Sequence, residues 1–142
     1  MPVRNAHASW EGNLQEGKGM MKLGSGAFQG AYSYKTRGED EPGTNPEELV
    51  GAALAGCFSM ALSSALGKAG FTPVRIQTNA QVHLGKVEGK SRITEINLTT
   101  EAEVPGISQE AFMKIAEETK SGCPVSAALT GVKITLAAHL LP

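Results

Sequence analysis

The longest apolar run of this chain lies between Leu49 and Leu62, where every residue except Ser59 is apolar or small. Apolar positions cover every face at the helical period, and a helix that is apolar all round is typical of a buried core element. The run is shorter than the roughly 20 residues that cross a bilayer, and Gly51 and Gly56 dilute it further. We therefore expect a core helix and not a membrane span.

Sequence signals mark both ends of this helix. An asparagine can cap the start, a proline fits the first helical position, and a glutamate three residues after the cap completes a capping box. A lysine and then a glycine favour the end. The residues concerned are Asn45, Pro46, Glu48, Lys68 and Gly70. They predict one long helix within residues 44–70.

Three short strands are predicted before the helix, over residues 3–10, 17–24 and 31–36. The turn-rich segment GSGAFQG separates the second from the third, so this part of the chain reads as a β-meander. The polar segment RGEDEPGTNP then leads into the helix as a turn-forming loop that carries Arg37.

Two long strands are predicted after the helix. Residues 74–84 alternate cleanly between two faces, and a turn in GKVEGKS leads to a second alternating segment over 93–104. Ile93 breaks the register of that second segment. The pattern predicts a long, half-buried hairpin.

Two helices and a last strand complete the chain. Ser108 can cap an amphipathic helix, and Cys123 followed by Pro124 marks the start of a shorter helix that runs to Gly131. The inner stripe of the first helix is formed by Phe112, Ile115, Ala116 and Thr119. Residues 132–140 alternate again and predict a final strand.

These elements predict an α+β fold, with two groups of antiparallel strands and helices packed around a central buried helix, in a single domain over residues 1–142. One small sheet and one amphipathic helix cover such a helix incompletely. Its side between Gly51 and Gly56 is thin, because small residues let another backbone approach closely. We expect a second subunit to pack there in a symmetric homodimer.

Composition and charge limit the partners. The 13 basic and 14 acidic residues give a net charge of −1, which offers no basic surface for nucleic acid or an anionic membrane. No segment has the features of a secretion signal, so we expect a cytoplasmic protein. His7, His83 and His139 fall on three separate predicted strands and share no ligand spacing with the cysteines. We expect solvent-facing histidines, no metal and no cofactor.

The two cysteines are the candidate chemistry. In a reducing compartment they favour a catalytic or redox-sensing pair over a permanent disulfide. A thiol ionises more easily at a helix N-terminus or beside a cation. Cys123 meets the first condition at the start of its helix, whereas Cys57 sits mid-helix and needs a cation, for which Arg37 is the nearest candidate in sequence. Local physics therefore makes Cys123 the more acidic thiol and Cys57 a structural one.

Several segments resemble the osmotically inducible protein C family over nearly the whole chain: TRGEDEPG, TNPEELVGAA, CFSMAL, AGFTP, VPGIS and SGCPVS. The resemblance implies an OsmC-like fold in an intertwined homodimer, with active sites at the subunit interface. It also implies a stress-defence peroxidase that reduces organic hydroperoxides, and more weakly hydrogen peroxide, with two cysteines and a dithiol reductant. In the sister branch of organic hydroperoxide resistance proteins an earlier glycine-rich turn carries the arginine. Here that turn, GNLQEGKG, has only Lys18, which disfavours the sister branch.

The resemblance also implies residue roles. Cys57 resembles the peroxidatic thiol and Cys123 the resolving thiol, which reverses the order that local physics favours. Arg37 matches the arginine that activates the thiolate, and Glu47 matches the carboxylate that orients that arginine. Glu47 and Cys57 lie about 15 Å apart along one helix, so either Arg37 bridges the gap or Arg37 and Glu47 act on the cysteine of the other subunit. We expect the second arrangement.

We expect an apolar lining for the carbon tail of the substrate, formed by Leu54, Phe58, Met60 and Phe28. Two alternative functions use the same residues. One is a thiol redox sensor that cycles between dithiol and disulfide without turnover. The other is a non-enzymatic dimer that holds a small apolar ligand, with both cysteines purely structural.

Overall fold

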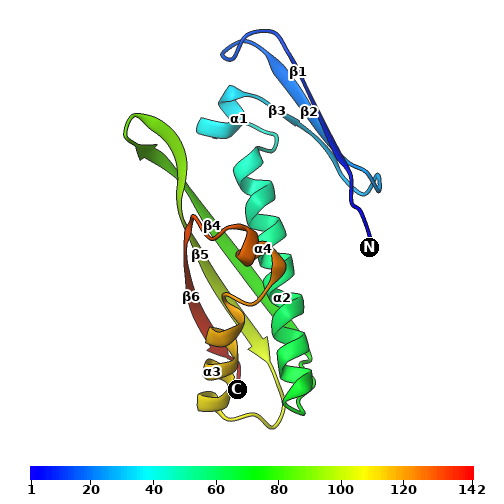
Figure 1. Ribbon diagram of the computed structural model, residues 1–142, viewed down its shortest axis with the longest axis vertical. Coiled ribbons are helices and arrows are strands. Elements are labelled where there is room, and N and C mark those ends of the chain that lie inside the picture. The colour runs from blue at the N-terminus through cyan, green and yellow to red at the C-terminus, as the bar shows by residue number, and fades with distance from the viewer. The chain divides into compact units, whose positions relative to one another are not determined.

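A computed structural model describes all 142 residues. The chain forms two compact units, Met1–Leu49 and Val50–Pro142 (Figure 1). The predicted α+β class is confirmed, with two small sheets, helices and one long helix. The single-domain assignment stays a prediction.

The first unit contains an antiparallel sheet in the order β1-β2-β3, which confirms the predicted meander. Its strands are β1 (Ala6–Glu11), β2 (Lys18–Leu23) and β3 (Gln29–Tyr32). The third strand is shorter than predicted, because helix α1 (Tyr34–Gly38) replaces its second half. Ser33 and Thr36 form a reciprocal capping box that starts this helix. Arg37 therefore lies on a helix, and its predicted place in a loop is wrong.

The first unit buries almost no apolar surface. Every buried apolar residue of the chain belongs to the second unit, and all six residues of β1 are exposed. Large apolar side chains of the first unit that remain exposed are Met1, Val3, Trp10, Leu14, Met20, Leu23 and Tyr34. A sheet needs its apolar face covered to be stable, so this one is left with apolar surface that another element could cover.

Helix α2 (Pro46–Lys68) begins and ends where the sequence predicts. The side chain of Asn45 accepts a hydrogen bond from the Glu48 backbone N–H at 2.7 Å, as expected of a cap. The predicted capping box is not completed, because the carboxylate of Glu48 instead accepts a hydrogen bond from the Thr44 hydroxyl at 3.0 Å. With 23 residues and an apolar composition, α2 is long enough to cross a membrane, so our length argument against a span is wrong.

The second unit contains a sheet in the order β4-β5-β6, from β4 (Arg75–Val87), β5 (Lys90–Glu103) and β6 (Lys133–Leu140). The predicted hairpin is confirmed, and its two turn residues, Glu88 and Gly89, both have positive φ. A β-bulge explains the broken register at Ile93. His83 pairs with Glu95 whereas Leu84 pairs with Ile93, so one residue of β5 is unpaired.

Strand β6 lies parallel to β5, so the prediction of purely antiparallel sheets is wrong for this pair. The helices α3 (Gln109–Thr119) and α4 (Pro124–Ala128) connect the two strands and carry the chain back to the end where β5 began. Ser108 caps α3 as predicted. Helix α4 ends at Ala128, three residues before the predicted end.

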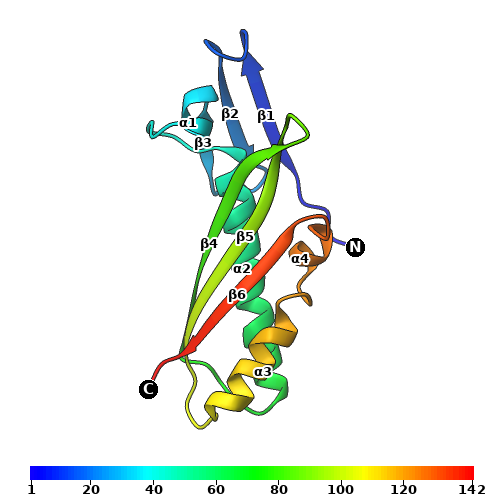
Figure 2. The ribbon, with the colours of Figure 1, turned by 90° about the vertical axis from the view of Figure 1, so that its left-hand side faces the viewer.

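The core lies between one face of the β4-β5-β6 sheet and the helices α2 and α3 (Figure 2). Residues of α2 spaced by four form its fully buried stripe: Leu54, Phe58, Leu62 and Leu66. The rest of α2 is covered less, and Met60 is 77% exposed. The thin side is divided. A Cβ on Gly51 would lie 3.0 Å from Val82 of β4, whereas nothing lies within 4 Å of Gly56. Only the second part of the thin side is open to another chain.

Candidate functional site: a thiol pair and an arginine–carboxylate pair

The two cysteines come together within the second unit. Cys57 lies in the middle of α2 and is half-buried, and Cys123 is the N-cap residue of α4 and is 0% exposed. Both are free thiols, and they lie close enough for each to influence the pKa of the other. The fold therefore makes neighbours of two sulfurs that are 66 positions apart in the sequence.

Three hydrogen bonds tie Cys123 to Ser126. The Cys123 thiol donates to the Ser126 hydroxyl oxygen at 3.2 Å, and the Ser126 backbone N–H donates to the Cys123 sulfur at 3.4 Å. The Ser126 hydroxyl in turn donates to the Cys123 carbonyl oxygen at 2.9 Å. The start of α4 thus fixes the position of the sulfur as an N-cap side chain.

The two thiols differ in acidity. Burial acts to raise the pKa of Cys123, but the Ser126 side chain and backbone N–H, together with Cys57 and the Val125 backbone, outweigh it, and the pKa of Cys123 is lowered. Burial raises the pKa of Cys57, the Val125 backbone opposes that rise in part, and the neighbouring Cys123 thiol adds to it. Cys123 is the more acidic thiol of this chain, as local physics predicts.

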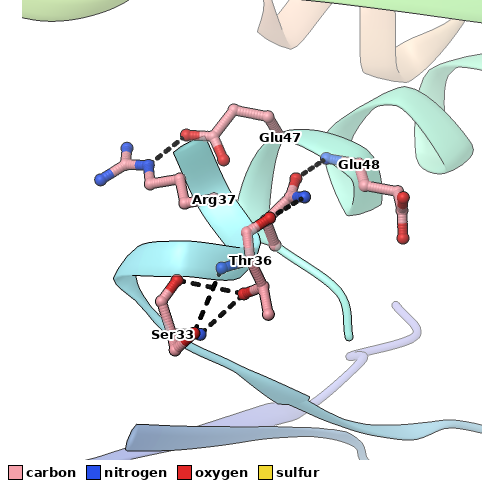
Figure 3. Close-up of polar contacts among 6 residues, drawn as sticks. Ser33, Thr36, Arg37, Glu47 and Glu48 are labelled. Carbon is pink, nitrogen blue, oxygen red and sulfur yellow. Dashed lines mark hydrogen bonds and ion pairs between the residues drawn. The ribbon is translucent and has the colours of Figure 1, made fainter. Parts of the chain in front are cut away.

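Arg37 and Glu47 form an ion pair within the first unit. The Arg37 Nε lies 2.6 Å from the Glu47 Oε1, and Figure 3 shows the two side chains meeting between α1 and the start of α2. The Glu47 side chain is 9% exposed and that of Arg37 is 45% exposed. The buried Glu47 Oε2 has no hydrogen-bond partner. The carboxylate therefore holds the arginine from one side while the outer guanidinium nitrogens remain free for another group.

Capping interactions hold this pair in place. The Ser33 and Thr36 capping box sets the start of α1, and the Asn45 side-chain amide donates to the Thr36 carbonyl oxygen at 3.0 Å (Figure 3). That contact ties the end of α1 to the cap of α2. Helix α1, which carries Arg37, and the first turn of α2, which carries Glu47, are thus held together within the first unit.

An apolar cavity of about 230 Å³ lies beside Arg37 in the first unit. Its lining residues are Trp10, Leu14, Tyr32, Ser33, Tyr34, Arg37 and Pro46. The rings of Trp10 and Tyr32 are tilted against each other with centroids 5.5 Å apart. Sequence reasoning missed this cavity, although large apolar residues in an otherwise polar, exposed segment were an available signal.

The four residues predicted to line the substrate site differ in their surroundings within the two units. Leu54 and Phe58 are fully buried in the core of the second unit, and Met60 on the same helix is exposed. Phe28 is half-buried in the first unit, just before β3. Leu54 and Phe58 follow the core spacing of α2, so their apolar character serves packing within this chain.

His7, His83 and His139 lie on β1, β4 and β6 and are exposed, which confirms the predicted positions. No group of three His, Cys, Asp or Glu side chains is arranged to hold a metal ion.

The fold and the thiol pair place this chain among α+β proteins that carry two neighbouring cysteines, one of them on a long helix. Residues 38–137 match the family described as OsmC-like protein. The chain is 51% identical over 134 residues to Peroxiredoxin OsmC of Escherichia coli (strain K12), covering 94% of this chain and 93% of that protein. It therefore belongs to the OsmC family, as the sequence resemblance indicated.

Solved structures agree with this fold. A Legionella pneumophila organic hydroperoxide resistance protein OsmC aligns with a TM-score of 0.74 at 20% identity, covering 98% of this chain and 99% of that one. The organic hydroperoxide resistance protein OhrB of Bacillus subtilis aligns with a TM-score of 0.70 at 24% identity, covering 96% and 98% of the two chains.

Proposed function

We propose that this protein is a thiol peroxidase that reduces organic hydroperoxides, and hydrogen peroxide more weakly, with a dithiol as reductant. The observation that carries the proposal is the pair of free thiols, Cys57 and Cys123, which lie close enough for each to shift the pKa of the other. The 51% identical relative named Peroxiredoxin OsmC supports it. Stress defence in the cytoplasm is the corresponding biological role.

The cycle has three balanced steps. The Cys57 thiol ionises, its thiolate attacks the distal peroxide oxygen and the O–O bond breaks, which leaves a sulfenic acid. The leaving alkoxide takes up the proton that Cys57 gave to the solvent and becomes the alcohol. The Cys123 thiol then attacks the Cys57 sulfur, a disulfide forms, and the sulfenic hydroxyl leaves as water with the proton of Cys123. A dithiol reduces the disulfide by exchange and is itself oxidised to a disulfide.

Cys57 needs a cation to begin this cycle, because its surroundings within one chain raise its pKa. We assign that cation to Arg37, oriented by Glu47. Since Glu47 and Cys57 are ten residues apart on α2, about 15 Å along its axis, the arginine and carboxylate act on the cysteine of the other subunit. A guanidinium beside a thiol favours the thiolate and lowers its pKa.

The homodimer is part of this proposal. The apolar residues exposed on the first unit and the open side of α2 near Gly56 and Met60 favour burial against a second copy. In such a dimer each chain behaves as one domain that contributes to two sites.

The cavity beside Arg37 supports an organic substrate. Its apolar lining suits the carbon group of a hydroperoxide better than hydrogen peroxide, while the guanidinium faces the polar peroxide end. We keep the predicted lining residues Met60 and Phe28 as candidates for contacts with the substrate in the dimer. Leu54 and Phe58 belong to the core against which Cys57 packs.

Steady-state consumption of cumene hydroperoxide with dithiothreitol tests the proposal. The unaltered protein is expected to turn over many times. Cys57→Ser and Cys123→Ser are each expected to lose steady-state consumption of the hydroperoxide. A sulfenic acid should be trapped by a dimedone reagent only in Cys123→Ser. A single stoichiometric burst from the unaltered protein would instead favour a redox sensor, and full activity of Cys57→Ser would refute the peroxidase.

A further inference from the structure

Ser126 is a buried hydroxyl that the proposed cycle does not yet use. It is the third residue of α4 and is 5% exposed. The hydrogen bonds of its hydroxyl and of its backbone N–H all go to one residue, Cys123. The buried hydroxyl therefore contacts Cys123 twice, because it accepts a hydrogen bond from the thiol and donates one to the carbonyl oxygen of the same residue.

The geometry suits both protonation states of Cys123. In the thiol state, the sulfur donates to the Ser126 oxygen at 3.2 Å and the hydroxyl donates to the Cys123 carbonyl at 2.9 Å. Because a hydroxyl hydrogen rotates freely about its C–O bond, the same oxygen can turn its hydrogen toward the sulfur once the sulfur is a thiolate. The Ser126 backbone N–H, 3.4 Å from the sulfur, donates in both states.

Burial makes these two donors important. Cys123 is 0% exposed, so its thiolate is cut off from water and depends on protein donors for stabilisation. Hydrogen bonds to an ionised acceptor are about twice as strong as those between neutral groups. The titratable group that faces the Cys123 sulfur is the Cys57 thiol on α2, and the backbone of Val125 contributes a further hydrogen bond.

We propose that Ser126 is a positioning residue for the resolving step, in which its hydroxyl and N–H hold the Cys123 sulfur as a thiolate aimed at Cys57. This inference rests on the proposed peroxidase cycle. In the step it serves, the Cys123 thiolate attacks the Cys57 sulfenic sulfur, the S–O bond breaks, and the leaving hydroxide takes the proton that Cys123 gave up. During this step the Ser126 hydroxyl, which accepts a hydrogen bond from the thiol, instead donates one to the thiolate, and it exchanges no proton with the sulfur.

The first test is an ultraviolet thiolate titration of Cys123 in a Cys57→Ser background, where it is the one remaining thiol. Adding Ser126→Ala is expected to move the midpoint up by about one pH unit, which lowers the thiolate fraction near pH 7 about tenfold. Ser126→Thr keeps a hydroxyl and is expected to titrate within a few tenths of a unit of the parent. Ser63→Ala, which removes an exposed hydroxyl of α2, is the matched control and should change nothing.

The second test is single-turnover kinetics with both cysteines present. Ser126→Ala should form the sulfenic acid at the normal rate but convert it to the disulfide about tenfold more slowly, and Ser126→Thr should restore the rate. Should Ser126→Ala not fold, Ser126→Gly removes the same hydroxyl and keeps the N–H. An unchanged titration and unchanged disulfide formation in a hydroxyl-free variant would overturn the inference while turnover stays intact. Failure of the peroxidase proposal itself would give a different result, because neither the unaltered protein nor any variant would then consume the hydroperoxide.

Discussion

Replacing Arg37 by methionine tests how strongly the arginine–carboxylate pair holds the first unit together. Methionine keeps most of the alkyl chain but removes the guanidinium that lies 2.6 Å from Glu47. The Glu47 carboxylate would then be buried with neither oxygen paired, since its second oxygen already has no partner.

The magnitude follows from the burial of the two partners. Breaking a fully buried pair costs about 3–5 kcal/mol and an exposed pair about 0–1 kcal/mol. Glu47 is 9% exposed but Arg37 is 45% exposed, so solvent screens one side of the pair. We expect Arg37→Met to lower the free energy of unfolding by about 1–3 kcal/mol, between those limits.

A double-mutant cycle in urea measures the interaction. Glu47→Gln removes the charge and keeps an acceptor, and the double variant should be more stable than the sum of the single changes predicts, by about 1 kcal/mol. Lys120→Met is the matched control, because its partner Glu117 is 62% exposed and the expected loss is at most about 0.5 kcal/mol. Protein concentration is held fixed, since dimer stability depends on it. A loss at Arg37 no larger than at Lys120, with no coupling to Glu47, would refute the reasoning.

Three further outcomes can be measured. Gly56→Leu, on the open side of α2, should leave the helical circular dichroism signal unchanged but convert a dimer to a monomer in light scattering; an unchanged dimer would place the interface elsewhere. Gly89→Ala should destabilise the hairpin by about 1 kcal/mol in urea, because φ is +78 there, and a neutral result would contradict the turn assignment. In single-cysteine variants without Arg37, Cys123 should ionise at lower pH than Cys57, and the reverse order would contradict the hydrogen-bond assignments.

The same pKa directions set how each thiol affects stability. Folding lowers the pKa of Cys123, so the stability it contributes is present above the pKa of the unfolded thiol and is lost as pH falls through the lowered value. Folding raises the pKa of Cys57, so its contribution is present below the unfolded pKa and is lost as pH rises through the raised value. The midpoint pH of alkaline unfolding should therefore rise in Cys57→Ser and fall in Cys123→Ser.

Local signals predicted the helices and their ends well. The cap at Asn45, the proline at the start of α2 and the cap at Ser108 act over three or four residues, and the structure has each of them. Helix α1 was missed because alternation through residues 31–36 favours a strand, although Ser33 and Thr36 offered the capping signal. In such a short segment an alternating pattern and a helix cap can predict different structures, and here the helix cap at Ser33 determines the structure.

Strand direction was not predictable from alternation. A period of two in residues 132–140 shows which side chains share a face but is the same for parallel and antiparallel pairing. The parallel pairing of β6 depends on where α3 and α4 return the chain, which is a property of their packing. The role of the predicted lining residues stays a prediction, since Leu54 and Phe58 would be apolar both as core residues and as substrate contacts.

Local sequence signals predict which thiol is more acidic in a single chain, but they do not include the effect of a second subunit. Cys123 at its cap position was expected to be the more acidic thiol, and its pKa is lowered. The role that family resemblance gives to Cys57 requires a cation that this thiol does not have within its own unit. Sequence carries the residues for both roles, but the contact that would activate Cys57 depends on assembly.

The most direct test of the central claim is a peptide map of the reduced protein after one equivalent of cumene hydroperoxide, with free thiols blocked before digestion. The account predicts a disulfide between Cys57 and Cys123 of the same chain, formed as one equivalent of cumyl alcohol appears. Recovery of both cysteines as blocked thiols, with the hydroperoxide unconsumed, would contradict it.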